Sequence, residues 1–217
     1  MPDLTEATRL KSDTLQGALA NAIPILRGLD QLGQLVPVGD WILTDDELIS
    51  RLALWRARAM DMFLAQFEST AAKTKVYLRE YSIARDDRIL FMIETEEGFV
   101  GHIGLANIED STAEIDNVMR GVPAHGDGLM SASERALVSW AFDNLDVTSL
   151  HLRVLSSNVA AKRLYERDGF ATTKRLSLRR EPAVDGTVLV PCDSNQANVP
   201  FTCDVMTLDR GRFRSQD

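Results

Sequence analysis

The sequence predicts a mixed α/β fold (α+β) in which helices flank a mostly antiparallel sheet. Apolar residues recur at helical spacing in four segments after residue 40 and follow strand patterns in six others. These segments come in the order helix, helix, three strands, helix, strand, helix and two strands. With 217 residues, of which 45% are hydrophobic and 26% charged, the chain can bury one sizeable core.

The first 35 residues are expected to form an N-terminal helical extension ahead of a main domain at residues 36–217. They include the run LQGALANAIPILRGLDQLGQL, which suggests a helix that is interrupted near Pro24 and closed by glycines. The sequence leaves the function of this extension open. An apolar lead-in of this kind could cover an exposed sheet edge or mediate a homodimer.

Two helices are predicted next, at residues 44–67 and at about residues 71–84. In the first helix Thr44 can serve as the cap, and acidic residues crowd the first turn. The apolar face of this helix carries Leu48, Leu52, Trp55, Ala59 and Phe63.

Three strands are predicted in close succession, at residues 88–95, 98–108 and 113–120. The short polar turns between them are typical of an antiparallel meander. A helix at residues 131–145 and an alternating strand at residues 150–155 follow. After one further helix, a last pair of strands, ATTKRLSLRR and FTCDVMTLD, brackets a polar insert of twenty residues.

The further helix is the segment NVAAKRLYERDGF at residues 158–170. Asn158 can cap its start, and Gly169 is the residue type that ends a helix in a left-handed conformation. Tyr165 shares a face with residues that should pack inward, namely Ala161, Leu164 and Asp168. The tyrosine is therefore either a core residue whose hydroxyl reaches a backbone carbonyl, or a functional group.

A glycine-rich junction precedes the helix at residues 131–145, with Gly121, Gly126 and Gly128 in the run RGVPAHGDGLMSASERAL. Glycines let a backbone approach a ligand closely, and the free N–H groups at a helix start favour phosphate oxygens. The alternative is that these glycines serve the turn alone. The run lacks the GK[ST] ending of a Walker loop and the third glycine of a dinucleotide turn.

These runs, together with IGL, AEIDNVMRG and LHLRVLSSNVAAKRLYERDGF, resemble the GCN5-related N-acetyltransferases, the GNAT family. The pattern NxxAxxLYExxGF from Asn158 to Phe170 is close to that of the family, and the resemblance spans roughly Thr44 to Leu208. It implies a GNAT-type fold, acyl transfer, and acetyl-CoA as the cosubstrate.

The resemblance also implies functions for individual residues. Backbone groups of the glycine turn would bind the pyrophosphate of acetyl-CoA, and these belong to His125, Gly126, Asp127, Gly128, Leu129 and Met130. Met119 would lie beside the pantetheine arm, and Asn158 would contact the cofactor. Tyr165 matches the family tyrosine that protonates the leaving thiolate. A phenol with a pKa near 10 suits this task because it is neutral at the working pH.

One departure from the family pattern concerns the glycine turn. Family members carry Gln or Arg three residues before the first glycine, whereas this chain has Pro123 there and Arg120 three residues further back. The turn is therefore expected to be longer or differently bent. Arg120 could reach the phosphates from another direction or serve another purpose. The VMRG and GLM runs resemble a subset of the family associated with sugar nucleotides and polysaccharide gene clusters.

An amine must be neutral to attack a thioester, so a base is needed. Alternation along AEIDNVMR places Glu114 and Asp116 on one face of the strand and Asn117 on the other. Either acid could accept a proton directly or through water; the alternative is that both are solvated on an exposed face. His102 is the second candidate base.

Composition narrows the partners and the compartment. A net charge of −8 argues against a nucleic-acid partner, because such binding depends on clustered Lys and Arg. No apolar run is long enough for a membrane span, and no secretory signal precedes the domain, so a cytoplasmic protein is expected. Cys192 and Cys203 are too few for a disulfide framework, and three scattered histidines argue against a metal site.

The sequence thus predicts an acetyl-CoA-dependent N-acetyltransferase in which a primary amine attacks the thioester directly. No cysteine lies in the runs that carry the resemblance, so no covalent acyl-enzyme is expected. A small amine such as a nucleotide-linked amino sugar is the favoured acceptor, and a protein N-terminus is the second. A non-catalytic acyl-CoA-sensing module on the same fold is the alternative of a different class.

Overall fold

The computed structural model describes residues 4–122 and 128–215. Its helices are α1 (Leu4–Arg9), α2 (Leu15–Ala20), α3 (Asp46–Arg58), α4 (Ala71–Tyr77), α5 (Leu129–Asn144), α6 (Val159–Arg167) and α7 (Arg210–Arg214). Its strands are β1 (Ile23–Arg27), β2 (Asp30–Pro37), β3 (Ala65–Phe67), β4 (Ile89–Thr95), β5 (Gly98–Ala106), β6 (Thr112–Arg120), β7 (Ser149–Leu155), β8 (Ala171–Ala183), β9 (Gly186–Cys192) and β10 (Thr202–Asp209).

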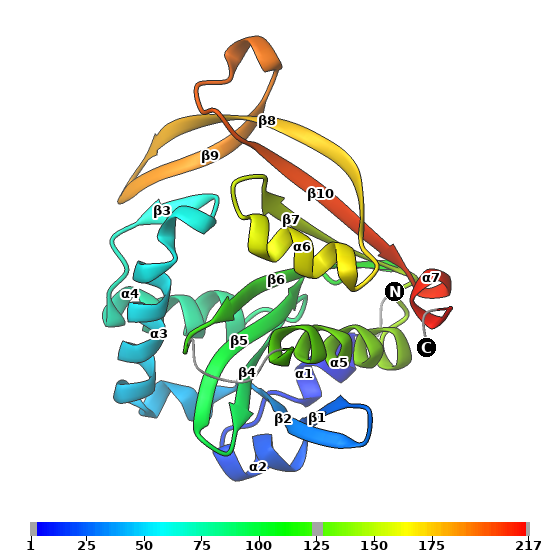
Figure 1. The fold of residues 1–217 in the computed structure, drawn as a ribbon. Coiled ribbons are helices and arrows are strands. Elements are labelled where there is room, and N and C mark those ends of the chain that lie inside the picture. The colour runs from blue at the N-terminus through cyan, green and yellow to red at the C-terminus, as the bar shows by residue number, and fades with distance from the viewer. Residues whose placement is uncertain (1–3, 123–127, 216–217) are drawn as a thin grey trace.

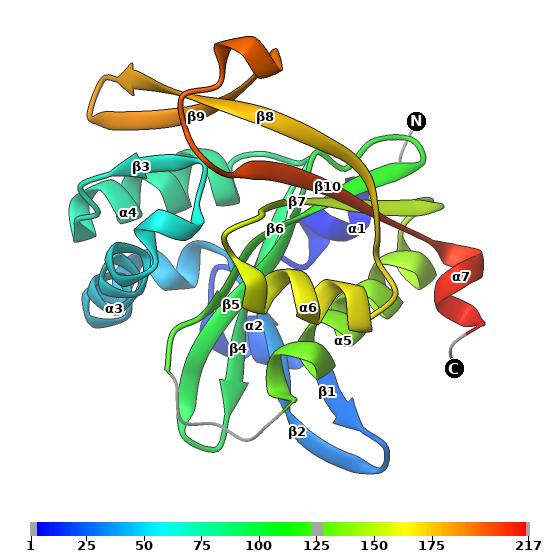
Figure 2. The same ribbon diagram turned by 45° about the horizontal axis from the view of Figure 1, so that its top comes forward.

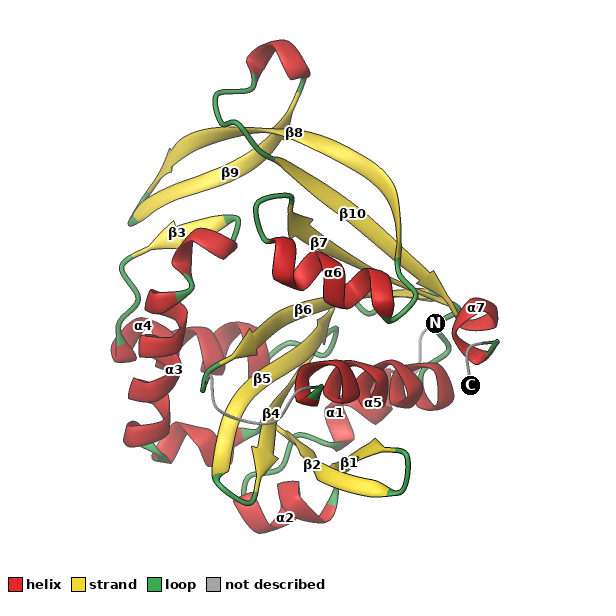
Figure 3. Cartoon of the chain, viewed as in Figure 1, coloured by secondary structure: helices red, strands yellow, loops and turns green. Residues whose placement is uncertain are grey.

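The strands form one sheet in the order β1-β2-β4-β5-β6-β7-β10-β8-β9-β3 (Figures 1 and 3). Among the described strands, β6 and β7 form the one parallel pair, and all other neighbours are antiparallel. The predicted fold class, a mostly antiparallel sheet flanked by helices, is confirmed.

The parallel pair β6 and β7 separates soon after it begins. The two strands pair over Thr112 to Glu114 and Ser149 to His151, and then diverge toward their C-terminal ends (Figure 1). The cause lies in β6, where Asn117 has a φ of 52° and the register against β5 shifts. Such a bulge bends a strand and re-aims its side chains. The split leaves backbone groups of both strands facing an opening rather than each other.

The core lies on both faces of the sheet, as β4 shows. Ile89, Phe91 and Ile93 pack into the cluster that includes the buried face of α5. Leu90 and Met92 alternate with these residues along the strand and pack into the cluster that includes α3. A strand that is buried on both faces has a continuous run of apolar residues, and β4 has such a run from Ile89 to Ile93.

The second half of the expected N-terminal helix is instead a β-hairpin. Strands β1 and β2 pair around a turn in which Gly28 has a φ of 62°, and β2 continues the sheet by pairing with β4. Pro24 lies in the edge strand β1, a position that proline tolerates because no ladder hydrogen bond is needed on the open side. The expected division near residue 35 falls within β2.

Two further expectations need correction. The helix expected at residues 44–67 ends at Arg58, and its cap is Asp45, whose side chain accepts a hydrogen bond from the Leu48 N–H at 2.8 Å. The residues after it form a 3-10 turn and the short strand β3. The polar insert contains β9, which pairs with both β8 and β3. The other predicted elements are confirmed, with the stretch after α4 continuing as a π-helix at Leu78–Ile83.

Within residues 4–122 and 128–215, no helix combines the length and apolar character needed to cross a membrane.

Candidate active site

A cavity of about 860 Å³ occupies the opening between β6 and β7 and continues to α3 and α4. Its two ends differ in character. One end is formed by the starts of α5 and α6, and the other by side chains from α3, β3, α4 and the π-helix after it. In Figure 2 the ribbons of α5 and α6 and those of α3 and α4 lie on opposite sides of β6. Asp116, Met119 and Tyr165 also line the cavity.

The start of α5 lines the first end of the cavity. Gly128 is the N-cap in a left-handed conformation, with a φ of 100°, and makes no side-chain cap hydrogen bond. The residues that follow, Leu129, Met130 and Ser131, line the cavity. The first N–H groups of a helix have no partner within the helix and carry partial positive charge, so they suit anionic oxygens. Of the other predicted cradle residues, His125, Gly126 and Asp127 lie outside the described residues.

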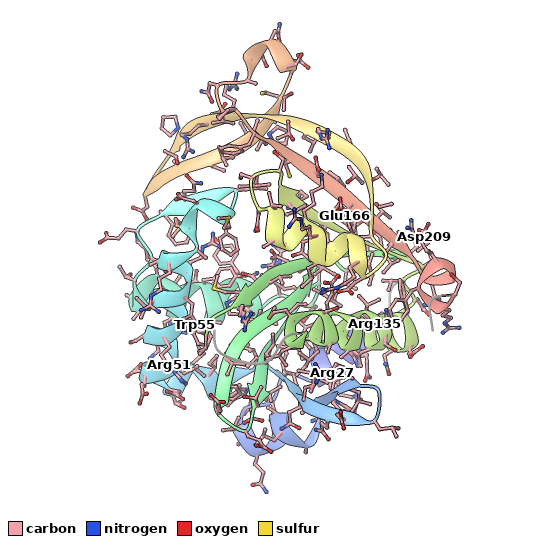
Figure 4. All side chains as sticks on the ribbon, in the orientation of Figure 1. Arg27, Arg51, Trp55, Arg135, Glu166 and Asp209 are labelled. Carbon is pink, nitrogen blue, oxygen red and sulfur yellow. The ribbon has the colours of Figure 1, made fainter. Side chains whose placement is uncertain are left out.

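Arg27 adds a positive charge beside this helix start. Its Nη1 atom lies 3.6 Å from the position that a Cβ on Gly128 would occupy. Figure 4 labels Arg27 on β1, next to α5. The sequence pattern did not predict this residue, because a helix was expected where β1 runs. The signal was the glycine two residues before Asp30, which marks a hairpin turn.

Asn158 and Met119, which were expected beside the cofactor, both line the cavity. The Oδ1 atom of Asn158 accepts a hydrogen bond from the Ala161 N–H at 3.2 Å, which confirms it as the cap of α6. Met119 is buried at the end of β6 and packs against the α3 cluster. The two residues approach the cavity from different sides.

Tyr165 is fixed by the end of α6. The Phe170 N–H donates to the Tyr165 carbonyl at 2.9 Å, the Gly169 N–H donates to the Glu166 carbonyl at 3.3 Å, and Gly169 has a φ of 100°. The ring packs edge-on against Phe170, with centroids 6.1 Å apart. Among the described residues no group hydrogen-bonds to its hydroxyl, so the carbonyl-bound core tyrosine is not observed. Burial raises the pKa of Tyr165 and keeps the phenol protonated.

Glu114 is fully engaged by its neighbours. Arg153 donates to its carboxylate from Nε at 2.7 Å and from Nη2 at 3.3 Å, and Asn107 Nδ2 donates at 2.8 Å. The side chain is 8% exposed, so the expectation of a solvated acid on an open face is wrong for this residue. Both oxygens of this carboxylate therefore already accept hydrogen bonds from Arg153 or Asn107.

Asp116 is more available. Its side chain is 40% exposed, and its carboxylate accepts from the Asn117 N–H at 2.7 Å and from Asn117 Nδ2 at 2.8 Å. Arg88 Nη2 lies 3.8 Å away. The exposed part of Asp116 faces the cavity, where surrounding protein groups still displace much of the water, and this desolvation raises the pKa of Asp116 despite these partners, which makes it a stronger base than an ordinary carboxylate. The predicted alternation fails here, because the bulge brings Asn117 to the side of Asp116.

His102 lines the cavity in its neutral form. Its Nδ1 atom lies 2.6 Å from the carbonyl oxygen of Asn117 and can donate to it. Burial lowers the pKa of His102 to about 4, so the ring stays uncharged near neutral pH. His102 is therefore a weaker base than an ordinary histidine.

Neither cysteine belongs to the site. Cys192 and Cys203 are free, neither lines the cavity, and burial raises the pKa of Cys203 to about 11. A thiol that stays protonated is a poor nucleophile. In the part of the chain that the structure describes, no group of three or more His, Cys, Asp or Glu side chains could hold a metal ion.

The sequence matches the model of the acetyltransferase (GNAT) domain over residues 41–171, which is more than half of the chain. No curated protein sequence matches it.

Solved structures share the fold. A probable acetyltransferase of the GNAT family from Chromobacterium violaceum ATCC 12472 has a TM-score of 0.63 at 17% identity, over 88% of this chain and 93% of that one. Spermidine N-acetyltransferase from Vibrio cholerae, in complex with CoA and spermine, has a TM-score of 0.58 at 19% identity, over 78% and 92%. The ribosomal L7/L12 alpha-N-protein acetyltransferase RimL, in complex with CoA, has a TM-score of 0.62 at 14% identity, over 87% and 97%.

Proposed function

The chain belongs to the GNAT acetyltransferase family, and from this premise we propose that it transfers the acetyl group of acetyl-CoA to a primary amine by direct attack. The observation that carries the proposal is that Asp116 and Tyr165 line the same cavity, which begins at the start of α5, where the N-cap is Gly128. A base, a proton donor and an anion-binding helix start are the parts that such a transfer requires.

The first end of the cavity fits acetyl-CoA, which supplies the thioester. The amides at the start of α5, from Gly128 to Ser131, would hold its pyrophosphate, with Arg27 adding charge. We extend this cradle to His125, Gly126 and Asp127. Met119 and Asn158 would flank the pantetheine arm between the diverging strands.

Asp116 is the proposed base, acting directly or through one water. In the reaction an N–C bond forms, the C–S bond breaks, one proton leaves the amine nitrogen, and the departing sulfur takes up one proton. Tyr165 is the proposed donor to that sulfur, because burial keeps its hydroxyl protonated and no described group uses it. Both reactants held in one cavity lower the entropic barrier.

For the acceptor we propose a small amine, with a nucleotide-linked amino sugar as the favoured example. The VMRG and GLM runs, which resemble the sugar-nucleotide subset of the family, support this choice. The structural neighbours include enzymes named for spermidine and for a ribosomal protein N-terminus, so these two acceptor types belong in the test.

The test begins with calorimetric titration of acetyl-CoA and a free-thiol release assay on amino sugars, sugar nucleotides, polyamines and peptides. Binding of acetyl-CoA with thiol release on one amine class supports an enzyme. Binding without release on any amine would favour a sensing module.

Three variants then assign the residues. Tyr165→Phe and Asp116→Asn should each lower kcat by about 10² or more while the Kd for acetyl-CoA stays unchanged. Glu114→Gln should mainly lower the melting temperature, because it leaves Arg153 without its carboxylate. If Glu114→Gln lowers kcat more than Asp116→Asn does, the base is Glu114. Full turnover by Tyr165→Phe would remove the tyrosine from the mechanism.

A further inference from the structure

We propose that the acceptor carries an anionic group, a phosphate or a carboxylate, close to its amine, and that Arg56, Ser69 and Arg88 bind this group. The inference rests on the proposed function, since it names the substrate class of the same cavity. All three residues line the second end of the cavity, away from the start of α5.

Each of these residues has a buried donor atom without a hydrogen-bond partner. The atoms are the Nε of Arg56, the Oγ of Ser69 and the Nε of Arg88, and none of them meets an acceptor among the described residues. A buried donor left unpaired costs about 1 to 3 kcal/mol, and more when it is charged. Folded proteins therefore keep few of them. The described residues contain six such donor atoms, and the gathering of three of them around one cavity indicates a ligand that supplies acceptors.

The charge of Arg56 is also unbalanced. Its Nη2 donates to the Ala65 carbonyl at 2.9 Å, and its guanidinium stacks over the Phe63 ring at 3.4 Å from the centroid. No carboxylate within 4.0 Å pairs with it in the part of the chain that the structure describes. Burial lowers the pKa of Arg56 to about 10, because the loss of water outweighs the opposing effect of the charge of Asp116, which does not pair with it directly. A negatively charged ligand group would restore the balance.

Arg88 lies between the proposed anion-binding residues and the proposed base, Asp116. Its Nη2 lies 3.8 Å from Asp116 Oδ2, and its Nη1 donates to the Tyr77 hydroxyl at 3.3 Å. The unpaired Nε belongs to the same guanidinium, so an anion on Nε lies only a few bond lengths from Asp116. An amine attached close to that anion would reach the proposed base. A polyamine fits this end poorly, because its additional ammonium groups would face Arg56 and Arg88.

The first experiment compares matched acceptors in the thiol-release assay. Glucosamine 6-phosphate is paired with glucosamine for the phosphate arm, phenylalanine with phenylalaninamide for the carboxylate arm, and spermidine is the polycation. We call the acceptor without the anionic group the neutral partner of each pair. We expect at least one acceptor that carries the anionic group to exceed its neutral partner tenfold or more in kcat/KM. The arm in which this occurs identifies the anion. Equal or faster turnover of the neutral partners, or spermidine as the best acceptor, would overturn the inference.

The second experiment uses variants with a matched control. Arg56→Gln and Arg88→Gln should raise KM for the anionic acceptor tenfold or more, leave the Kd for acetyl-CoA unchanged, and affect the neutral partner less. Arg51→Gln is the control, because Arg51 lies on the same helix (Figure 4), also has a buried unpaired Nε, and does not line the cavity. A KM effect of Arg51→Gln equal to that of Arg56→Gln would show a structural cause and overturn the assignment.

The two proposals fail differently. Acetyl-CoA binding without thiol release on any acceptor would overturn the proposed function, and the acceptor class with it. Release that prefers neutral or cationic amines would overturn the acceptor class alone.

Discussion

At the scale of single residues, the backbone torsion of Asn117 decides which groups meet in the cavity. Its positive φ of 52° is a conformation that asparagine tolerates better than most residues. The turn at this residue lets its amide donate to Asp116 while its carbonyl oxygen meets His102. Its Nδ2 also lies 2.8 Å from the Tyr77 hydroxyl. One backbone torsion thus connects the proposed base, the neutral imidazole of His102 and the second end of the cavity, which we call the acceptor end.

Neutral His102 should make folding stability depend on pH. Its folded pKa of about 4 lies below the ordinary value of 6.5, so the unfolded chain binds the extra proton between these two values. The contribution to stability is present above pH 6.5 and is lost as pH falls toward 4. We expect urea unfolding to show that the wild type loses about 2 kcal/mol more than His102→Gln between pH 7.5 and pH 5.0. Parallel losses in both proteins would contradict this.

Glu134 should have the opposite dependence. It is fully buried in α5, neither of its carboxylate oxygens meets a donor group among the described residues, and burial, together with the charge of Asp168 and a hydrogen bond to it, raises the pKa of Glu134 well above the ordinary value. Stability is then lost as pH rises through the raised pKa. Glu134→Leu should therefore stabilise the protein by about 1 to 4 kcal/mol at pH 8, and by less at pH 5.

Chemical unfolding at the two pH values measures the effect of Glu134→Leu. Glu166→Leu, at an exposed glutamate on α6 that Figure 4 labels, is the control and should change little. A Glu134→Leu protein that is less stable than the wild type at pH 8 would indicate a stabilising partner for this carboxyl.

The sequence predicted some of these residues and missed others for a physical reason. Tyr165, Asn158 and Gly169 are set by the local pattern of one helix, where capping and 3.6-residue spacing suffice. Arg56 and Arg88 come together from separate elements, and no local pattern shows that. The choice of Asp116 over Glu114 depends on Arg153 in the next strand.

At the scale of elements, α3 and the end of β6 contact each other through a glycine. A Cβ on Gly121 would lie 2.1 Å from Cδ2 of the Trp55 ring (Figure 4), a distance that real Cβ contacts do not show. Gly121 and Val122 also donate their N–H groups to the Val100 carbonyl, at 2.9 and 3.0 Å. This glycine, which the sequence grouped with the phosphate cradle, therefore has a packing function.

Gly121→Ala should displace either Trp55 or the segment that leads from β6 toward α5. Overpacking of this kind costs about 1 to 3 kcal/mol. We expect a lower melting temperature and weaker acetyl-CoA binding by calorimetry. Gly211→Ala in α7 is the matched control, since no atom lies within 4 Å of its Cβ position. Unchanged stability and affinity in Gly121→Ala would show that Trp55 moves without consequence.

Elements were predictable where their pattern was long. Helix α5 and strands β4 to β6 each bury several apolar residues in a regular pattern, and this pattern predicted them from the sequence. The strands β1, β2, β3 and β9 were missed. Of these, β1, β3 and β9 lie near the ends of the strand order and carry at most one buried residue each, and the partner of β3 is distant in sequence.

At the scale of the whole molecule, the sheet connects the two ends of the cavity. The hairpin of β1 and β2 lies beside α5 at one end of the strand order, and β3 lies at the other end next to β9 (Figures 1 and 2). Since β3 lies between α3 and α4, its pairing with β9 ties the acceptor end of the cavity to residues more than 110 positions later. Arg180 Nη1, which bonds Gln66 Oε1, reinforces the same junction.

Breaking this junction should loosen the acceptor end alone. A Cβ on Gly186 would lie 2.1 Å from the Gln66 carbonyl oxygen and 2.9 Å from the Phe67 Cα, and both are backbone atoms that cannot give way as a side chain can. Gly186→Ala should therefore separate β3 from β9 and shift Phe67, which lines the cavity. We expect KM for the acceptor to rise several-fold while the Kd for acetyl-CoA stays constant, because α5 and α6 are not part of the junction. Gly211→Ala should change neither constant. If Gly186→Ala leaves the acceptor KM unchanged, the geometry of the second end does not depend on β9, and the residues of α3 and α4 hold it by themselves.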